Sequence, residues 1–366
     1  MTKILHIITD KNIGGAGHAV LALIDAVDTS AFETEVIVPE NSLVIPLLAA
    51  RDITYYESHH IADKSFSLAG IKTLNRLIKQ IRPDIVHTHS SLSGRIAARF
   101  SRFARVVHTR HSAFPIAAWR KRFPIKQLSG FINNTLSDRV IAVSPAVTEN
   151  LVDMGTARGK IRTVFNGTPP VRSFTPEEVN SLKLKYDIPP GAFTLSIMAR
   201  LTEVKGHDYI LDAAKAVPDV LILVAGVGDR QSHLEERIAR EGIANVRMLG
   251  WIDKTDELIA VTDAQLNASF GTEASSMSLI LGMSAGCPAI VSDYGGNPYL
   301  IQDGVNGLHT RIHDSVAIAE AIKRLKTDPE LYDRLSEGAR EVYNKRFTSK
   351  KMAYDTEAVY YELLGM

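Results

Sequence analysis

Residues 267–306 read NASFGTEASSMSLILGMSAGCPAIVSDYGGNPYLIQDGVN, and this stretch decides the fold expected for the chain. A strand is expected over 264–268, a polar turn then holds Glu273, and a helix of roughly a dozen residues is expected from Ser276. A second buried strand follows at 288–292. A strand, a turn and a helix N-terminus at the carboxyl edge of a parallel sheet together predict a phosphate site.

Hydroxyl side chains stand at the start of this predicted helix, where unpaired amides and the helix dipole favour an anion. These residues are Ser275, Ser276 and Ser278. The alternative is an ordinary βαβ crossover in which the serines only cap the helix.

The same stretch resembles the donor-sugar motif of retaining GT-B glycosyltransferases of the family-4 type, the group 1 glycosyltransferases. In that family a Glu begins the turn, a second Glu follows eight residues later, and the segments A-G-x-P and G-G-x-x-E complete the motif. Glu273 matches the first Glu, and Leu281 stands in place of the second. The other matches are Ala285-Gly286-Cys287-Pro288, Gly295-Gly296 and Asp303-Gly304. Milder departures are Ala274 and Ser276, where glycines are usual, and Tyr299, where G-G-x-x-E would end.

Composition limits the class of protein. The chain has 366 residues, enough for two α/β domains, and its formal net charge of +1 argues against a dedicated nucleic-acid binder. The single cysteine, Cys287, cannot form an internal disulfide, which fits a reducing compartment. No apolar run approaches the ~18 residues of a membrane span, and the first residues have no signal-peptide pattern. We therefore expect a cytoplasmic protein.

The first α/β series begins with an apolar strand over 4–8, followed by a glycine-rich turn that lets a ligand approach the backbone. The glycines of this turn are Gly14, Gly15 and Gly17. Their spacing is not G-x-G-x-x-G, so a dinucleotide cofactor is only weakly indicated. The resemblance assigns this turn to the family's first loop, which faces the cleft between two domains. The alternative is a tight turn without a ligand.

Histidines gather at or just beyond the ends of two predicted neighbouring strands, over 84–89 and 105–109. They are His87, His89, His108 and His111. A zinc site is a weaker interpretation, because no acidic partner is evident nearby, and we predict no metal. The resemblance implies that His111 contacts the donor sugar, since V-x-x-x-x-H-S/T after this strand matches the family's pattern. The alternative is a helix-capping or merely exposed histidine.

Residues 114–131 combine aromatic with basic side chains, a composition that suits an anionic membrane surface. The aromatic members are Phe114, Trp119, Phe123 and Phe131, and the basic members are Arg120, Lys121, Arg122 and Lys126. A peripheral position on the cytoplasmic face of the membrane follows from this interpretation. The alternative is an ordinary surface helix whose aromatic side lies in the core.

An Asn-Gly turn and two prolines at 166–170 indicate that the chain leaves one domain, and 171–191 reads as a linker around a short helix at 176–185. The expected fold class is α/β. The resemblance implies a GT-B fold of two Rossmann-like, doubly wound domains that face a central cleft. The acceptor-side domain would cover 1–168 together with the C-terminal helix 348–366, which crosses back to it, and the donor domain would cover 190–347.

The segment A-R-L-T-E-V-K-G at 199–206 places Arg200 and Lys205 at the end of a predicted strand, where two cations could meet one diphosphate. It matches the G-R-x-x-x-x-K-G pattern of the family; the alternative is a solvent-exposed pair. The further predicted nucleotide contacts are Gly226, Gly228, Trp251, Ile252, Ser275, Ser276, Met277, Ser278 and Leu281.

The resemblance implies transfer of a sugar, with retention, from a UDP- or GDP-linked donor to a glycan or lipid-linked acceptor, in surface polysaccharide or glycolipid synthesis. No cofactor or metal ion is expected, because fixed cations and a helix N-terminus would stabilise the leaving diphosphate. Glu273 would position sugar hydroxyls, with His111 opposite it across the cleft. No enzymic nucleophile is expected, since in this family the leaving phosphate is thought to take the acceptor's proton.

Leu281 leaves other functions open. In relatives the Glu at this position binds the ribose hydroxyls, so nucleotide affinity could fall by about 1–3 kcal/mol. A non-catalytic GT-B protein that only binds its ligand is therefore the main alternative. A nucleotide-sugar epimerase lacks support from the pattern at 199–206. A dinucleotide oxidoreductase would need G-x-G-x-x-G and an acid for the ribose.

Overall fold

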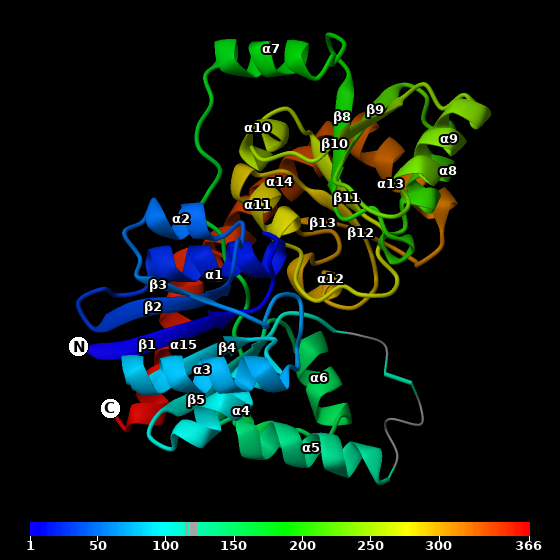
Figure 1. Ribbon diagram of the computed structural model, residues 1–366. Helices are drawn as coiled ribbons and strands as arrows, with labels where there is room; N and C mark the ends of the chain where they lie inside the picture. The colour runs from blue at the N-terminus through cyan, green and yellow to red at the C-terminus, as the bar shows by residue number, and fades with distance from the viewer. Residues whose placement is uncertain (114–115, 118–122) are drawn as a thin grey trace. The chain divides into compact units, whose positions relative to one another are not determined.

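The computed structural model describes residues 1–113, 116–117 and 123–366 (Figure 1). The chain forms two compact units, the first made of 1–167 and 349–366 and the second of 168–348. Each unit is a parallel sheet covered by helices on both faces, as the α/β pattern predicts. Among the helices of the described residues, none combines the length and the apolar character that a membrane span requires.

The first unit contains a seven-stranded parallel sheet in the order β3-β2-β1-β4-β5-β6-β7. Its strands are β1 (Thr2–Ile8), β2 (Phe32–Pro39), β3 (Tyr55–Ser58), β4 (Ile85–His89), β5 (Arg105–Arg110), β6 (Arg139–Ala142) and β7 (Ile161–Thr163). Its helices are α1 (Gly15–Ala26), α2 (Ile45–Ala49), α3 (Leu68–Ile81), α4 (Leu92–Ser101), α5 (Ile125–Leu136), α6 (Pro145–Asp153) and α15 (Ser349–Leu364).

Strand β1 is buried on both sides, and its side chains alternate between two cores. Ile4 packs with α1 and α15, and Ile8 with α1 and α2, on one face of the sheet. Leu5 and Ile7 pack with α3 and α4 on the other face. His6 shares its face with Ile4 and Ile8, so a polar ring lies between two apolar side chains of the strand.

The last helix, α15, packs against α1 and completes this layer. Its Tyr360 is 1% exposed, and the hydroxyl lies 2.6 Å from Nδ1 of His87. This hydrogen bond joins residues 273 positions apart in the chain. The C-terminal helix therefore contributes both apolar packing and a buried polar contact to the first unit.

The second unit repeats the same arrangement with six parallel strands in the order β10-β9-β8-β11-β12-β13. The strands are β8 (Phe193–Met198), β9 (Val220–Ala225), β10 (Val246–Gly250), β11 (Ala264–Asn267), β12 (Ala289–Ser292) and β13 (Gly307–Thr310). The helices are α7 (Pro176–Lys185), α8 (His207–Lys215), α9 (Gln231–Glu241), α10 (Thr255–Ile259), α11 (Met277–Ala285), α12 (Asn297–Leu300), α13 (Ser315–Thr327) and α14 (Pro329–Arg346).

The expected linker over 171–191 is part of the second unit. Helix α7 begins with a capping box formed by Thr175 and Glu178. Beyond it, Leu182 and Tyr186 pack in one buried cluster with side chains of β9 and α10. Because these apolar side chains need a core to cover them, the segment is held against the domain instead of spanning free solvent.

The contact between Tyr360 and His87 gives a test of how α15 is held. Replacing Tyr360 with Phe keeps the packing but leaves a buried ring nitrogen without its partner, so we expect a loss of about 1–3 kcal/mol in the free energy of unfolding. Tyr361→Phe is the matched control, because the Tyr361 hydroxyl has no partner among the described residues. Urea titration followed by circular dichroism measures both variants. Equal losses would mean that the hydrogen bond contributes nothing specific.

Candidate functional site

Each sheet reverses its strand order next to its first strand, between β1 and β4 in the first unit and between β8 and β11 in the second. In open α/β sheets, ligands bind beyond the carboxyl ends of the strands at such a switch point. Most of the predicted site residues lie at the carboxyl ends of the strands of the two sheets or on the loops that follow them.

Glu273 lies in the turn after β11 and is 5% exposed. Three donors contact one of its carboxylate oxygens, Oε2: Nζ of Lys205 at 2.9 Å, Oγ of Ser269 at 3.0 Å and Nδ2 of Asn267 at 3.1 Å. The other oxygen, Oε1, accepts no hydrogen bond from the described residues. Glu273 is thus fixed through one oxygen and can accept a hydrogen bond from a ligand hydroxyl through the other.

Lys205 ends the short 3₁₀ turn Glu203–Lys205 that follows β8. Besides Glu273, its ammonium group contacts the backbone oxygen of Thr272 at 3.2 Å. The structure therefore brings two predicted site residues, Lys205 and Glu273, into one partly buried ion pair. Arg200 differs: its side chain is exposed, and it has no ion pair or hydrogen bond to the described residues.

Helix α11 begins as the serines predict, although it has nine residues and not a dozen. Ser276 is its N-cap and accepts a hydrogen bond from the amide of Leu279 at 3.4 Å. Ser278 donates to the backbone oxygen of Met198 at 3.2 Å. The hydroxyl of Ser275 is buried and has no hydrogen-bond partner within the described part of the chain. Of the three serines, Ser275 alone keeps an unused hydroxyl beside the turn of Glu273.

Leu281 lies one helical turn after Met277, and both side chains are half-buried. Its neighbours Leu279 and Ile280 are fully buried, whereas Leu281 keeps part of its surface exposed. The position of the missing family Glu is thus at the margin of the domain, where a polar side chain can reach water.

Gly226 and Gly228 follow β9 and pack closely against the loop after β8. A Cβ atom at Gly226 would collide with the backbone oxygen of Ala199, and one at Gly228 with that of Leu201. Close backbone packing therefore explains why glycine stands at these two positions, without a bound ligand. Gly14 and Gly17 differ, because a Cβ there would meet only ordinary contacts at 3.7 Å. With Gly15, they start α1, and the fold leaves the small size of Gly14 and Gly17 unexplained.

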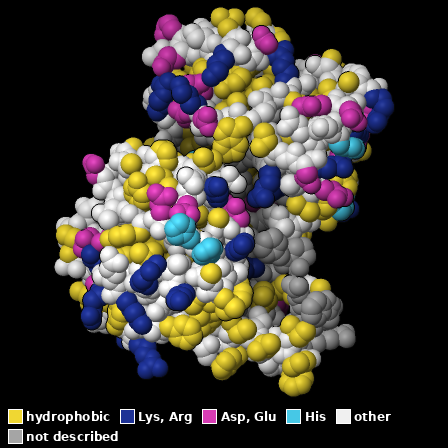
Figure 2. All heavy atoms as spheres, in the orientation of Figure 1, with side chains coloured by type: hydrophobic (Ala, Val, Ile, Leu, Met, Phe, Trp, Pro, Cys, Tyr) yellow, Lys and Arg dark blue, Asp and Glu magenta, His cyan; other side chains and the backbone are white. Residues whose placement is uncertain are grey.

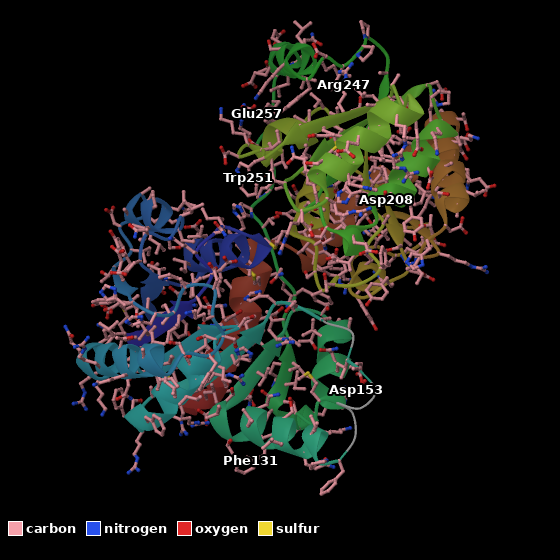
Figure 3. All side chains as sticks on the ribbon, turned by 45° about the vertical axis from the view of Figure 1, so that its right-hand side comes forward. Phe131, Asp153, Asp208, Arg247, Trp251 and Glu257 are labelled. Carbon is pink, nitrogen blue, oxygen red and sulfur yellow. The ribbon has the colours of Figure 1, made fainter. Side chains whose placement is uncertain are left out.

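Trp251 and Ile252 follow β10. Trp251 is 57% exposed, and its Nε1 lies 2.5 Å from Oδ1 of Asp253, which fixes the ring on the surface (Figure 3). Ile252 packs against the cluster that includes α7. An exposed, fixed indole ring of this kind can stack on a flat ligand.

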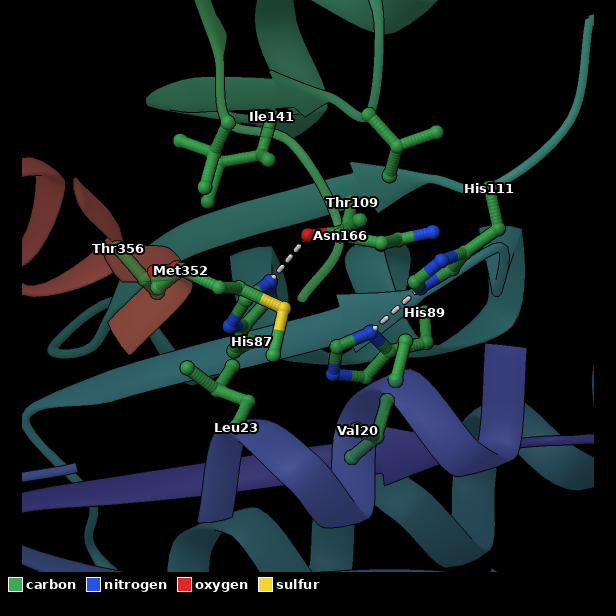
Figure 4. A pocket seen from close by; sticks show the side chains of 13 residues that line it. Val20, Leu23, His87, His89, Thr109, His111, Ile141, Asn166, Met352 and Thr356 are labelled. Atoms are coloured by element: carbon green, nitrogen blue, oxygen red, sulfur yellow. Dashed lines mark hydrogen bonds between the residues drawn. The ribbon is translucent and has the colours of Figure 1, made fainter. Parts of the chain in front are cut away.

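The first unit contributes a cavity of about 20 Å³ beneath the carboxyl ends of β4 and β5, with rings of His87, His89 and His111 in its lining (Figure 4). His87 is bonded on both nitrogens, to Tyr360 and to Oγ1 of Thr109, each at 2.6 Å. His89 lies between two other histidines. Its Nε2 is 2.9 Å from Nδ1 of His6, and its Nδ1 is 3.0 Å from Nε2 of His111.

The fourth predicted histidine, His108, lies on the opposite face of the sheet and contacts Oγ1 of Thr88 at 3.2 Å. Its place in the cluster is taken by His6, which sequence reasoning missed. The available signal was a histidine inside the apolar run of β1, because a polar ring in a buried strand needs a polar partner.

A metal ion is geometrically possible at His6, His87 and His89, whose ligand atoms lie within 4.8 Å of one another. However, both nitrogens of His87 and of His89 already have hydrogen-bond partners. No carboxylate among the described residues joins the cluster, so a divalent cation would be buried there without a compensating charge. We interpret the cluster as a hydrogen-bonded network.

The described part of segment 114–131 exposes its apolar side chains. Phe131 on α5 is 66% exposed, Leu128 61% and Phe123 81% (Figure 3). Figure 2 shows hydrophobic side chains gathered at the lower edge of the first unit, where Figure 1 places α5. The alternative of a helix with its aromatic side in the core is therefore wrong for Phe131; Gly130 is the buried residue of α5. Phe114, Trp119, Arg120, Lys121 and Arg122 lie outside the described residues.

A larger groove of about 760 Å³ lies at the other edge of the second sheet, where β8, β9 and β10 begin. Its lining includes Pro189, Lys215, Asn245 and Arg247, and none of the predicted site residues. Judged by volume alone, this groove would be the candidate ligand site. The predicted site residues, however, lie at the carboxyl edge of the sheet.

Family models match most of the chain. Residues 180–342 match the family Glycosyl transferases group 1, and residues 13–172 match Glycosyltransferase Family 4. EpsD of Bacillus subtilis (strain 168), whose name proposes a glycosyltransferase activity, is 28% identical over 82% of each chain. N-acetyl-alpha-D-glucosaminyl L-malate synthase of Bacillus anthracis is 26% identical over 88% of this chain and 86% of its own.

Solved structures share the fold across nearly the whole chain. A glycosyltransferase from Rickettsia africae ESF-5 superposes with a TM-score of 0.86 at 21% identity, covering 99% of this chain and 98% of that one. Anabaena Alr3699/HepE, solved with UDP and glucose, superposes with a TM-score of 0.85 at 19% identity, covering 99% and 100%. Family models match both halves of the chain, and solved glycosyltransferases share its GT-B fold over nearly the whole length. The chain therefore belongs to the group 1, family-4 type glycosyltransferases.

Proposed function

We propose that this protein transfers a sugar, with retention, from a UDP- or GDP-linked donor to a glycan or lipid-linked acceptor. The observation that carries the proposal is the buried Glu273, held through Oε2 by Lys205 and with Oε1 left for a ligand. Support comes from Anabaena Alr3699/HepE, which was solved with UDP-glucose, and from a 25% identical Escherichia coli relative named as a galactosyltransferase that uses UDP-Gal and a diphosphoundecaprenol acceptor. Surface polysaccharide or glycolipid synthesis is the process that these names suggest.

The leaving diphosphate needs its charge neutralised as the glycosidic bond breaks. Arg200 and Lys205 would provide two cations, and the N-terminus of α11 would provide amides and the free hydroxyl of Ser275. Lys205 and the amides of α11 are held in place before the reaction, so they need little reorganisation, and together with Arg200 they could act without a metal ion. Trp251 would stack on the nucleobase.

Glu273 suits a positioning role better than a nucleophilic one. The three hydrogen bonds to Oε2 fix the orientation of the carboxylate, and Oε1 stays available to accept a hydrogen bond from a sugar hydroxyl. Retention without an enzymic nucleophile then requires the leaving phosphate to take the acceptor's proton. His111 keeps the role that the family resemblance gives it, a contact to the donor sugar.

Arg200→Ala tests the diphosphate site directly. Arg200 is exposed and has no partner among the described residues, so its removal should leave the fold unchanged. Lys205 is a poorer target, since Glu273 would be left unpaired at a cost of about 3–5 kcal/mol. We expect UDP affinity to fall about tenfold and uridine affinity to stay the same, because a charge-assisted bond contributes about 1.5–3 kcal/mol.

Isothermal titration calorimetry measures both ligands, with Arg240→Ala as the control, since Arg240 is an exposed arginine on α9. Equal losses for UDP and uridine would remove Arg200 from the diphosphate site.

The second candidate function, a non-catalytic GT-B binding protein, rests on Leu281. Because Leu281 is only half-buried, the domain should tolerate a carboxylate there. If only the ribose contact is missing, Leu281→Glu should tighten nucleotide binding by about 1–3 kcal/mol and raise kcat/KM together. Leu281→Gln is the matched control with the same shape and no charge.

Calorimetry and a transfer assay with an acceptor panel measure the two effects. A folded Leu281→Glu protein with unchanged affinity and no transfer to any acceptor would favour the binding protein. Conversion of the donor into an epimer without transfer would favour an epimerase.

We also propose that the segment around α5 rests on the cytoplasmic face of an anionic membrane. The exposed side chains of Phe123, Leu128 and Phe131 could enter the interface, and the neighbouring basic residues 120–122 would attract anionic lipid. A lipid-linked acceptor would then be within reach of the enzyme.

Sedimentation with vesicles checks this proposal. The protein should cosediment with anionic but not neutral vesicles, and salt should release it. Replacing both Leu128 and Phe131 with Ser, or reversing Arg120, Lys121 and Arg122 to Glu, should abolish cosedimentation. Val316→Ser, at a residue 66% exposed on α13, is the control. Indifference to both changes would make the segment an ordinary surface helix.

A further inference from the structure

Three imidazole rings form a continuous hydrogen-bonded chain inside the first unit. Nδ1 of His6 lies 2.9 Å from Nε2 of His89, and Nδ1 of His89 lies 3.0 Å from Nε2 of His111 (Figure 4 shows the second contact). His6 is 2% exposed and His89 6%. Nδ1 of His111, the end of the chain, is buried and has no hydrogen-bond partner among the described residues.

All three rings are neutral at pH 7. Burial lowers the pKa of His6 and of His111 to about 4 and holds the pKa of His89 well below its usual range. A neutral imidazole has one N–H donor and one bare acceptor nitrogen. Each bond in the chain therefore needs a protonated nitrogen facing a bare one.

This requirement couples the rings. If Nδ1 of His6 carries the proton, then His89 must accept on Nε2 and carry its own proton on Nδ1, and His111 must do the same. In the reverse case all three rings carry the proton on Nε2. The chain thus has two states, and they differ in whether Nδ1 of His111 is a donor or an acceptor.

We propose that His6 and His89 are positioning residues that set the protonation of His111 Nδ1, so that this buried nitrogen is presented as a hydrogen-bond donor to an oxygen of the ligand. The unpartnered nitrogen supports this, because a buried polar atom without a partner is costly unless a ligand or water pairs with it. The part of the proposal that concerns turnover rests on the proposed function, in which His111 contacts the donor sugar.

Histidine-labelled protein allows the chain to be tested without substrate. The ¹⁵N chemical shifts of the ring nitrogens should assign His6, His89 and His111 to the same tautomer. In His6→Asn the amide can both donate and accept, so the chain loses its direction. The two ring-nitrogen shifts of His111 should then move toward each other, although residue 6 does not touch His111.

His108→Asn is the control, because His108 is a buried histidine of β5 on the opposite face of the sheet. It should leave the His111 shifts unchanged. Different tautomers among the three rings, or His111 shifts that ignore the change at residue 6, would overturn the coupling. Tight binding of Zn²⁺ that removes the resonances of His6, His87 and His89 together would assign the cluster to a metal and would overturn it as well.

A pair of substitutions at His89 tests the link to turnover. The amide of Asn reaches the place of Nδ1 and can keep the bond to His111, whereas the amide of Gln reaches the place of Nε2 and keeps only the bond to His6. We expect His89→Gln to lower kcat/KM for sugar transfer about tenfold, the equivalent of one hydrogen bond, and His89→Asn to lower it less.

UDP affinity should stay unchanged in both variants, since Arg200 and Lys205 belong to the second unit. If His89→Gln alters the His111 shifts but not the transfer rate, the positioning role is wrong while sugar transfer stands. A wild-type protein that transfers no sugar would instead remove the proposed function, and the shifts would still decide whether the chain exists.

Discussion

Parallel strands cannot be joined by tight turns, and this constraint organises both units. Every connection must return across a face of the sheet, in most cases as a helix, so that all carboxyl ends lie along one edge. Residues far apart in the chain meet there as a result. Lys205 follows β8 and Glu273 follows β11, and these strands are neighbours at the switch point. In the first unit the same constraint sets His89 beside His111.

The two units use different solutions to bury polar groups at this edge. In the second unit the carboxylate of Glu273 is compensated by the ammonium of Lys205 and by two uncharged donors. A buried ion pair of this kind is sensitive to the loss of either partner. In the first unit the histidines are kept neutral by burial and satisfy one another. The hydrogen bonds of such a neutral network depend on which ring nitrogen of each histidine carries the proton, and not on charge.

Glycine acts in two ways in the loops at this edge. Gly226 and Gly228 are required by close backbone packing, so a glycine pattern there says little about a ligand. Gly14 and Gly17 have room for a Cβ atom, so their presence calls for another reason, and the approach of a ligand to the backbone is the physical one. The structure thus separates glycines that the sequence presents alike.

Local patterns in the sequence were sufficient for most of the fold. Apolar periodicity and capping residues predicted α7 with its observed bounds, and β4, β5, β11 and β12 to within one residue, because each depends on neighbours a few residues away. The short elements α12 and β13 were missed, since four residues hold too little periodic signal. The motif at 267–306 and the pattern at 199–206 also determined the family.

Only the tertiary structure decided how the site residues pair. The ion pair of Lys205 with Glu273 spans 68 positions, and the bond of His6 with His89 spans 83, so neither leaves a local pattern. The side of the sheet on which His108 lies depends on strand register, and the place of residues 174–188 depends on the core that their apolar side chains find. The sequence identified the side chains that could bind a ligand, and the tertiary packing determines which of them pair with one another.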